Sequence, residues 1–269
     1  MKTIRIKRKC FIGISFLLFG FLTACGKHVT NTNISQEETK KIEITMAPSK
    51  DSSPLQTDRN ARIKEYQSVL VTVYDKHTFP DDNDYGFDDN YDISENRFAV
   101  NDIDHDGNDE LIIEYTTTAM AGMVEKIYDF DRNTNAVTEE FEEFPNLTFY
   151  DNGIIEAGLS HNQGLAGDFW PYSLYKYDTE SDTYRFMGTV DAWDKSIAET
   201  GYDEKPFPTE IDKNGNGIVY YITSNGTTNI TNPIDKEEYD QWFDSYVGNA
   251  KKVNLPFMKL TKENIDRIK

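Results

Sequence analysis

The sequence predicts an α+β fold in which an antiparallel sheet dominates, with one helix before the sheet and helices after it. Three observations predict this. Apolar residues within 58–77 recur at three- and four-residue spacing, as they do on one face of a helix. Short runs rich in β-branched and aromatic residues, separated by polar turns, fill 97–223. Helical spacing returns after the break at Asn232-Pro233.

The first helix is expected over 58–77. Asp58 or Asn60 could cap its start, and Pro80 ends the region. The residues of its apolar stripe are Ile63, Tyr66, Val69, Leu70, Val73 and Tyr74.

The sheet region divides into short strands joined by turns. The expected strands are 98–100, 111–116, 123–130, 136–144, 147–150, 154–157, 173–177, 183–190 and 217–223. Asp151-Asn152-Gly153 indicates a tight hairpin. The segments that lead into the polar turns 131–135 and 178–182 resemble one another. An internal repeat would produce this likeness, but two exposed hairpins with aromatic strands would also produce it, and the second interpretation is favoured.

The end of the chain is expected to be helical again. Asp235 and Glu238 have the spacing of a capping box at the start of a helix. Leu255-Pro256 breaks that helix, and Thr261 begins a last short one that carries Ile265 and Ile268 on one face. The aromatic residues at helical spacing in the first of these helices are Tyr239, Trp242, Phe243 and Tyr246.

Acidic residues outnumber basic ones, with 47 Asp and Glu against 28 Lys and Arg, and the formal net charge is −19. Nucleic acid is therefore not expected as a partner, because binding it requires a basic surface. An anionic lipid surface would also repel the body of the protein.

The chain opens with a basic stretch followed by an apolar one. Residues 1–9 carry Lys and Arg but no acid, and 11–21 is apolar apart from Gly and Ser, which is short for a membrane span. The run ends in Leu22-Thr23-Ala24-Cys25, which resembles the lipobox of bacterial lipoproteins. The resemblance implies cleavage before Cys25 and attachment of diacylglycerol and a further acyl chain such as palmitate to that residue.

Three parts of the chain follow from this interpretation. Residues 1–24 are expected to be a signal peptide and 25–57 a polar, disordered tether, because the tether has few large apolar residues to bury. Residues 58–269 are expected to form a single domain held on the extracellular face of the cell membrane by lipid. Cys10 lies in the signal peptide, so no disulfide is expected within the domain.

One loop carries the spacing of a calcium site. Asp102, Asp104 and Asp106 occupy positions one, three and five of the loop, and Gly107 allows a sharp turn at position six. Two further ligands are expected, the backbone carbonyl of Asn108 at position seven and the carboxylate of Glu110 at position nine. Calcium binds six to eight oxygen atoms, and the carboxylates and the carbonyl of segment 102–110 would supply several of them. The segment therefore predicts a calcium ion as cofactor.

The context of this loop excludes an EF-hand, because position twelve is Ile113 and the flanking residues are of strand type. The segment resembles the calcium loops of FG-GAP and VCBS repeats, in which the ion lies between two strands. Glu110 departs from that pattern, which usually has Asp, and only one complete copy is present. The chain as a whole is similar to uncharacterised lipoproteins of Gram-positive bacteria, a group without an agreed activity.

Other polar segments give weaker predictions. Residues 212–217 match the first six positions of the same template, but Tyr220 stands where a carboxylate is needed, so a turn is favoured over a second site. Residues 131–135 lack the glycine and are expected to form a hairpin turn. The acidic segment 81–92 is expected to be a solvated loop, with a second metal site or a recognition surface as alternatives.

The glycine-containing loop around residues 160–170 offers a ligand contact through His161, Asp168 and Trp170. The sequence contains no nucleophile elbow, zinc-type histidine pair or phosphate-binding loop, so no catalytic residue is assigned.

The sequence thus favours a lipid-anchored extracellular lipoprotein whose calcium-stabilised domain binds an unknown protein or glycan, and an enzyme is less favoured. Two alternatives stay open. One is a cell-envelope hydrolase that uses paired carboxylates, and the other is an immunity or inhibitor lipoprotein whose acidic surface blocks a basic target.

Overall fold

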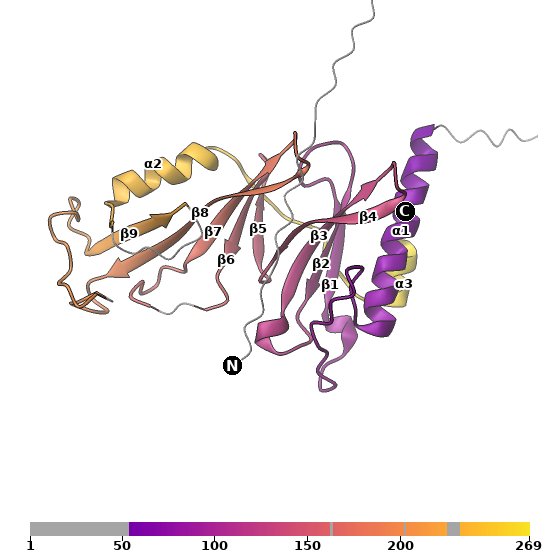
Figure 1. The fold of residues 1–269 in the computed structure, drawn as a ribbon, viewed down its shortest axis with the longest axis horizontal. Helices are drawn as coiled ribbons and strands as arrows, with labels where there is room; N and C mark the ends of the chain where they lie inside the picture. The colour runs from indigo at the N-terminus through magenta and orange to yellow at the C-terminus, as the bar shows by residue number, and fades with distance from the viewer. Residues whose placement is uncertain (1–53, 162–163, 202, 225–231) are drawn as a thin grey trace, which may run out of the picture. The chain divides into compact units, whose positions relative to one another are not determined.

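The computed structural model describes residues 54–269 except 162–163, 202 and 225–231. The expected signal peptide, the lipidation site Cys25 and most of the expected tether lie outside the described residues. The described part consists of two antiparallel sheets and three α-helices, which confirms the predicted α+β class with a dominant antiparallel sheet (Figure 1).

The first sheet, called sheet A, has the strand order β11-β1-β2-β3-β4. Two helices, α1 (Pro54–Lys76) and α3 (Lys262–Arg267), pack against it through an apolar core that includes Tyr66, Leu70 and Ile265. Its strands are β1 (Arg97–Asn101), β2 (Glu110–Tyr115), β3 (Val124–Asp131), β4 (Ala136–Glu143) and β11 (Met258–Lys259). Two short 3₁₀ helices, Ile93–Glu95 and Met120–Gly122, lie in its connections.

The second sheet, called sheet B, has the order β10-β5-β6-β7-β8-β9. Helix α2 (Lys236–Tyr246) packs against it, because Tyr239, Trp242 and Phe243 join a core formed by these strands. Its strands are β5 (Leu147–Tyr150), β6 (Ile154–Gly158), β7 (Tyr172–Asp178), β8 (Thr183–Asp194), β9 (Ile218–Thr223) and β10 (Lys252–Val253).

Sheets A and B share a buried apolar cluster. Sheet A contributes Ile112, Ile127 and Phe141, and sheet B contributes residues such as Phe149 and Tyr177. Strands β2 and β3 are therefore apolar on both faces, one facing α1 and the other facing sheet B. In β2 this explains the uninterrupted apolar run Leu111-Ile112-Ile113, whereas β3 also carries charged residues, among them Glu125 and Lys126.

The two hairpins with similar sequences also have similar structures. In β3–β4 the register shifts at Ile127/Tyr128, and in β7–β8 it shifts at the matching step, Leu174/Tyr175. Both turns end in a residue with positive φ, Asn135 at 52° and Asp182 at 52°. This agreement favours an internal repeat of a hairpin unit, the interpretation that the sequence alone left second.

Some boundaries differ from the sequence-based expectation. Helix α1 begins at Pro54 rather than at residue 58, so neither Asp58 nor Asn60 caps it and the last residues of the expected tether are helical. Proline suits the first turn of a helix, where its missing N–H leaves no bond unmade. Strand β8 continues to Asp194 because it also pairs with β9. The two-residue strands β10 and β11 have no local pattern that predicts them.

A buried carboxyl group on β3 gives a prediction about pH. Glu125 is 1 % exposed and accepts hydrogen bonds from the N–H groups of Asn146 (3.0 Å) and Leu147 (3.1 Å), which fix the start of β5. Burial raises the pKa of Glu125 from 4.5 to about 7. At pH values between 4.5 and about 7, Glu125 binds a proton in the folded state but has lost it in the unfolded state. The free energy of unfolding therefore falls as the pH rises through this range.

We therefore expect Glu125→Gln to remove part of this pH dependence. Between pH 5 and pH 8 the wild type should lose about 3 kcal/mol more of its free energy of unfolding than the variant does. Urea unfolding of both proteins at the two pH values measures the difference. Parallel losses in the two proteins would contradict the assignment.

Candidate metal centre

The loop between β1 and β2 is held in shape by its own side chains. Asn101 and Glu110 pair across the two strands at the base of the loop. Asp104 Oδ1 accepts a hydrogen bond from the N–H of Asp106 (2.9 Å), and Asp106 Oδ1 accepts one from the N–H of Asn108 (2.6 Å). Gly107 has φ of 94°, a left-handed conformation that a side chain would strain. The glycine is thus required by the turn, as the sequence predicted.

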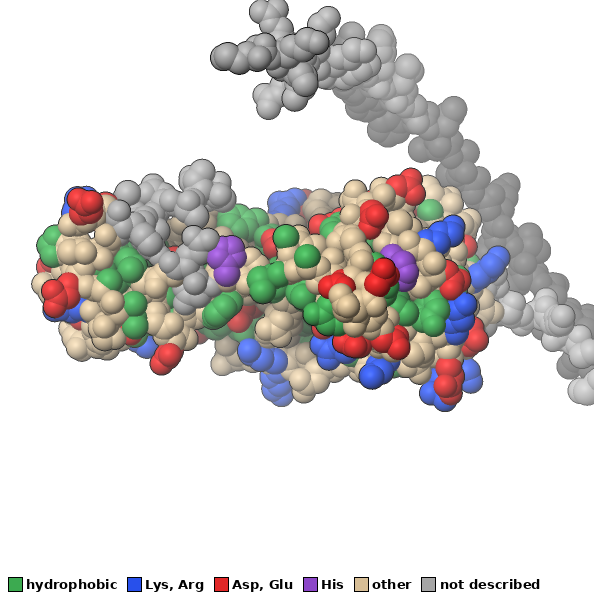
Figure 2. All heavy atoms as spheres, turned by 90° about the horizontal axis from the view of Figure 1, so that it is seen from below, with side chains coloured by type: hydrophobic (Ala, Val, Ile, Leu, Met, Phe, Trp, Pro, Cys, Tyr) green, Lys and Arg blue, Asp and Glu red, His purple; other side chains and the backbone are tan. Residues whose placement is uncertain are grey.

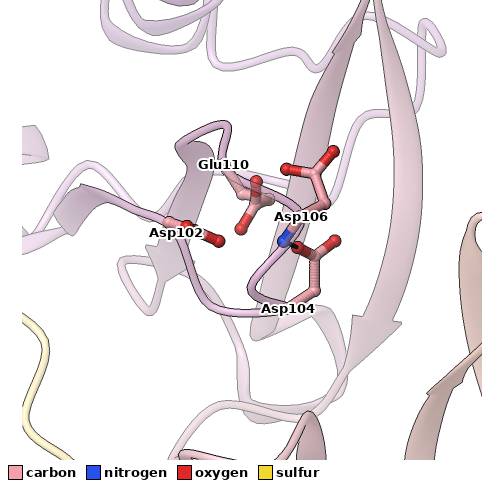
Figure 3. Close-up of side chains that lie close together, drawn as sticks. All are labelled: Asp102, Asp104, Asp106 and Glu110. Carbon is pink, nitrogen blue, oxygen red and sulfur yellow. Dashed lines mark hydrogen bonds between the residues drawn. The ribbon is translucent and has the colours of Figure 1, made fainter. Parts of the chain in front are cut away.

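The structure brings four carboxylates of this loop together. One oxygen from each of Asp102, Asp104, Asp106 and Glu110 lies within 4.8 Å of the others. Figure 3 shows the carboxylate of Glu110 between that of Asp102 and those of the other two residues. Such a group of oxygen atoms is able to hold a metal ion, and oxygen ligands suit hard cations such as calcium, magnesium and manganese.

Glu110 is the most deeply buried member of this group, with 1 % of its surface exposed. Its Oε2 atom accepts a hydrogen bond from the N–H of Ile103 (2.7 Å), which directs the side chain into the loop. Its Oε1 atom is buried and has no hydrogen-bond partner, and the same holds for Oδ1 of Asp102. Two buried oxygen atoms without a hydrogen-bond donor, in a group of four carboxylates, are able to act as ligands of a cation.

The charges of the loop also favour a bound cation. Burial, together with the nearby carboxylates, raises the pKa of Glu110 to about 10 and that of Asp104 to about 6, and burial is the larger cause for both. Within the described part of the chain, none of the four carboxylates forms an ion pair with Lys, Arg or His. A divalent cation would supply the missing charge and favour the ionised form of all four.

Helix α1 braces the far side of the loop. Arg62 donates a hydrogen bond from Nη1 to Oδ1 of Asn108 (2.9 Å), and Arg132 also donates to this oxygen. The hydroxyl of Tyr66 donates to the carbonyl of Asp109 (2.8 Å). The side chain of Asn108 is therefore engaged, which leaves its backbone carbonyl as the group expected to bind the ion. Arg62 and Tyr66 were not predicted as part of the site, because their link to the loop depends on how the helix packs.

Two residues near the loop were also not predicted from the sequence. Glu140 of β4 and Asp182 of the β7–β8 turn place carboxylate oxygens within 4.8 Å of one of Asp104. Both lie far from the loop in sequence, and no local motif marks them.

The turn at 212–217 uses its polar side chains internally. The two carboxylate oxygens of Asp212 accept hydrogen bonds from the N–H groups of Asn216 (3.1 Å) and Gly217 (3.0 Å). Oδ1 of Asn216 accepts from the N–H of Ile218 (2.8 Å). This pattern agrees with a plain turn. The 131–135 segment is likewise the turn of the β3–β4 hairpin, as predicted.

The acidic segment 81–92 is a loop whose carboxylates mostly cap its own backbone. Asp84, Asp88 and Asp92 accept hydrogen bonds from the N–H groups of residues two positions later. Asp81 does the same for Asn83 through Oδ1, and its Oδ2 atom also contacts Nζ of Lys126 at 3.0 Å, as Glu139 does at 2.6 Å. Because a buried ammonium group already occupies that acidic cluster, the alternative of a metal site there loses its support. Figure 2 shows acidic side chains gathered on one half of the face it views.

Of the three residues proposed for the ligand loop, only His161 lines the cavity beside this loop. His161, Asp168 and Trp170 are exposed, and the indole N–H of Trp170 donates to the carbonyl of Leu159 (2.8 Å). His161 lines a cavity of about 530 Å³, which neither of the other two residues lines. Two acids also line this cavity, and each has a partner: Glu142 contacts Lys126, and Glu143 accepts a hydrogen bond from Tyr175.

None of the described helices has the length and apolar composition needed to cross a membrane. No family model, curated protein or solved structure matches this chain. The function must therefore be inferred from the acidic loop and its surroundings.

Proposed function

We propose that this protein is a calcium-binding extracellular domain, held at the membrane by lipid on Cys25, in which the ion stabilises the β1–β2 connection. The observation that carries the calcium site is the unpartnered Oε1 atom of Glu110, which is buried among three other carboxylates. The alternating aspartates and Gly107 support calcium over smaller cations, because calcium accepts many oxygen ligands in a flexible geometry.

The ion would act on structure rather than on chemistry. Strands β1 and β2 lie next to one another in sheet A, and β1 also pairs with β11. By neutralising the acids at the end of these strands, calcium would fix the loop against α1 through Arg62 and Tyr66. A rigid, acidic body of this kind suits recognition of an extracellular protein or glycan, and this recognition is the proposed role of the domain.

Titration with calcium chloride tests the proposal directly. Isothermal titration calorimetry of the purified full chain should show saturable binding, with a dissociation constant of about 10⁻⁴–10⁻³ M, as in other extracellular modules. Glu110→Gln, which keeps the side-chain volume, should weaken binding at the loop, whereas Asp131→Asn in an exposed turn should leave it unchanged. Absence of saturable binding by the wild type would overturn the proposal.

A further inference from the structure

Glu140 owes its position to a β-bulge. In the β3–β4 pairing Ile127 lies opposite Phe141 and Tyr128 lies opposite Glu139, so Glu140 is the extra residue on its strand. A bulge changes the direction of a side chain and interrupts the alternation between faces. Glu139 therefore contacts Lys126 on one face, whereas Phe141 joins the core between sheets A and B.

The carboxylate of Glu140 meets two others where the sheets come together. Asp104 reaches this point from the β1–β2 loop, and Asp182 reaches it from the turn between β7 and β8. One oxygen from each of the three lies within 4.8 Å of the others. The hydroxyl of Thr183 donates to the carbonyl of Glu140 (3.4 Å), and Tyr177 donates to Oδ1 of Asp182 (2.6 Å). The three acids thus come from both sheets.

Buried polar atoms around this group have no partner. Both carboxylate oxygens of Glu140 are buried without a hydrogen bond. The side chain of Tyr184 is only 9 % exposed, its hydroxyl is buried and unpartnered, and the charges that act on it most strongly are those of Asp104 and Glu140. Unsatisfied groups of this kind are rare in folded proteins, so several in one place indicate a ligand that they bind.

The balance of charge also favours a cation. The loop carboxylates, Glu140 and Asp182 together make six acids in two groups that share Asp104. Within the described residues, none of the six forms an ion pair with a basic side chain. One divalent ion in the loop would leave Glu140 and Asp182 uncompensated, and burying an uncompensated charge is costly.

We infer that a second divalent cation, most suitably calcium, binds between Asp104, Glu140 and Asp182 and joins sheet A to sheet B. Asp104 would bridge the two ions, and Tyr184 would contribute its hydroxyl oxygen. Asp182 is exposed, which gives the ion a route from solvent. This inference rests on the proposed function, because the loop ion is the first member of the pair.

Counting bound ions tests the inference. Calorimetry with calcium chloride should give two ions per wild-type chain and one per Glu140→Gln chain, because the amide lacks the charge and should weaken the second site at least about tenfold. Asp182→Asn should behave in the same way. Glu180→Gln changes an exposed acid in the same turn as Asp182 and should keep two ions.

A second measurement separates loss of the site from loss of the fold. In chelator, Glu140→Gln should melt at a higher temperature than the wild type, because a neutral amide avoids the cost of burying or protonating a carboxylate beside other acids, and circular dichroism should show an unchanged fold. One ion bound by both the wild type and Glu140→Gln would overturn the second site while leaving the loop site in place. Two ions bound by Glu140→Gln would also overturn it, and no binding by the wild type would overturn the proposed function as well.

Discussion

Calcium is expected to raise the melting temperature of the purified protein, and Asp104→Ala is expected to abolish that rise. A ligand that binds only the folded state stabilises it by about 2.7 kcal/mol when its concentration is one hundred times its dissociation constant. For a chain of this size, that corresponds to a rise of about 5–10 °C. Asp104 is chosen because it belongs to both acidic groups, so its removal affects both the loop ion and the inferred second ion.

Melting curves in calcium at one hundred times the dissociation constant, about 10–100 mM, and in chelator measure this effect. The quantity of interest is the difference between the two conditions for each protein, because Asp104→Ala also removes a hydrogen bond to the N–H of Asp106. Asp131→Ala, in the exposed β3–β4 turn, is the matched control and should keep the full calcium-dependent rise. Equal melting temperatures of the wild type in calcium and in chelator would contradict the metal site.

Lys126→Met is expected to destabilise the folded protein strongly. The side chain of Lys126 is fully buried, and its ammonium group contacts Asp81 (3.0 Å), Glu139 (2.6 Å) and Glu142 (2.7 Å). It also lies over the rings of Phe79 (5.3 Å) and Tyr85 (5.0 Å). Burial alone would lower the pKa of Lys126, but the hydrogen bonds to Glu139 and Glu142 raise it above its ordinary value. The lysine is therefore charged and holds three acids together.

Methionine has nearly the same length and fills the same space, so the substitution removes the charge without opening a large cavity. Loss of one partner from a buried ion pair costs about 3–5 kcal/mol, and the lower end is expected because the three acids are partly exposed to water. Urea unfolding measures the loss. Lys205→Met, whose ion pair with Asp203 is exposed, should cost no more than about 1 kcal/mol. A similarly small loss for Lys126→Met would show that the cluster is not structural.

Much of the fold could be predicted because its signals are local. The apolar stripe of α1, with Tyr66 and Leu70, is visible in the sequence, and both residues are fully buried. The Asp151-Asn152-Gly153 turn and the strands on either side were predicted for the same reason. Exact ends were less predictable, as the start of α1 at Pro54 shows, because a helix end depends on what the helix packs against.

One part of the candidate site could be predicted from the sequence, and the other part could not. The alternation of Asp102, Asp104 and Asp106 before Gly107 is a local pattern, and the loop closes as such a pattern requires, with its carboxylates facing one another. Glu140 has no such signal, because its orientation comes from a bulge that exists only in the pairing of β3 with β4. The likeness of the two hairpins could be seen in the sequence, but only their equal register shifts favour a repeat.

By itself, the sequence determined the class of the fold, the acidic loop and the need for glycine at its sharpest point, since each depends on residues close together in the chain. The tertiary structure decided which acids have partners. Packing gave the cluster around Asp81 the ammonium group of Lys126. It left Oε1 of Glu110, both carboxylate oxygens of Glu140 and the hydroxyl of Tyr184 buried without a hydrogen-bond partner. The physical reason is that the cost of burying a charge depends on neighbours from distant strands, which local sequence does not specify.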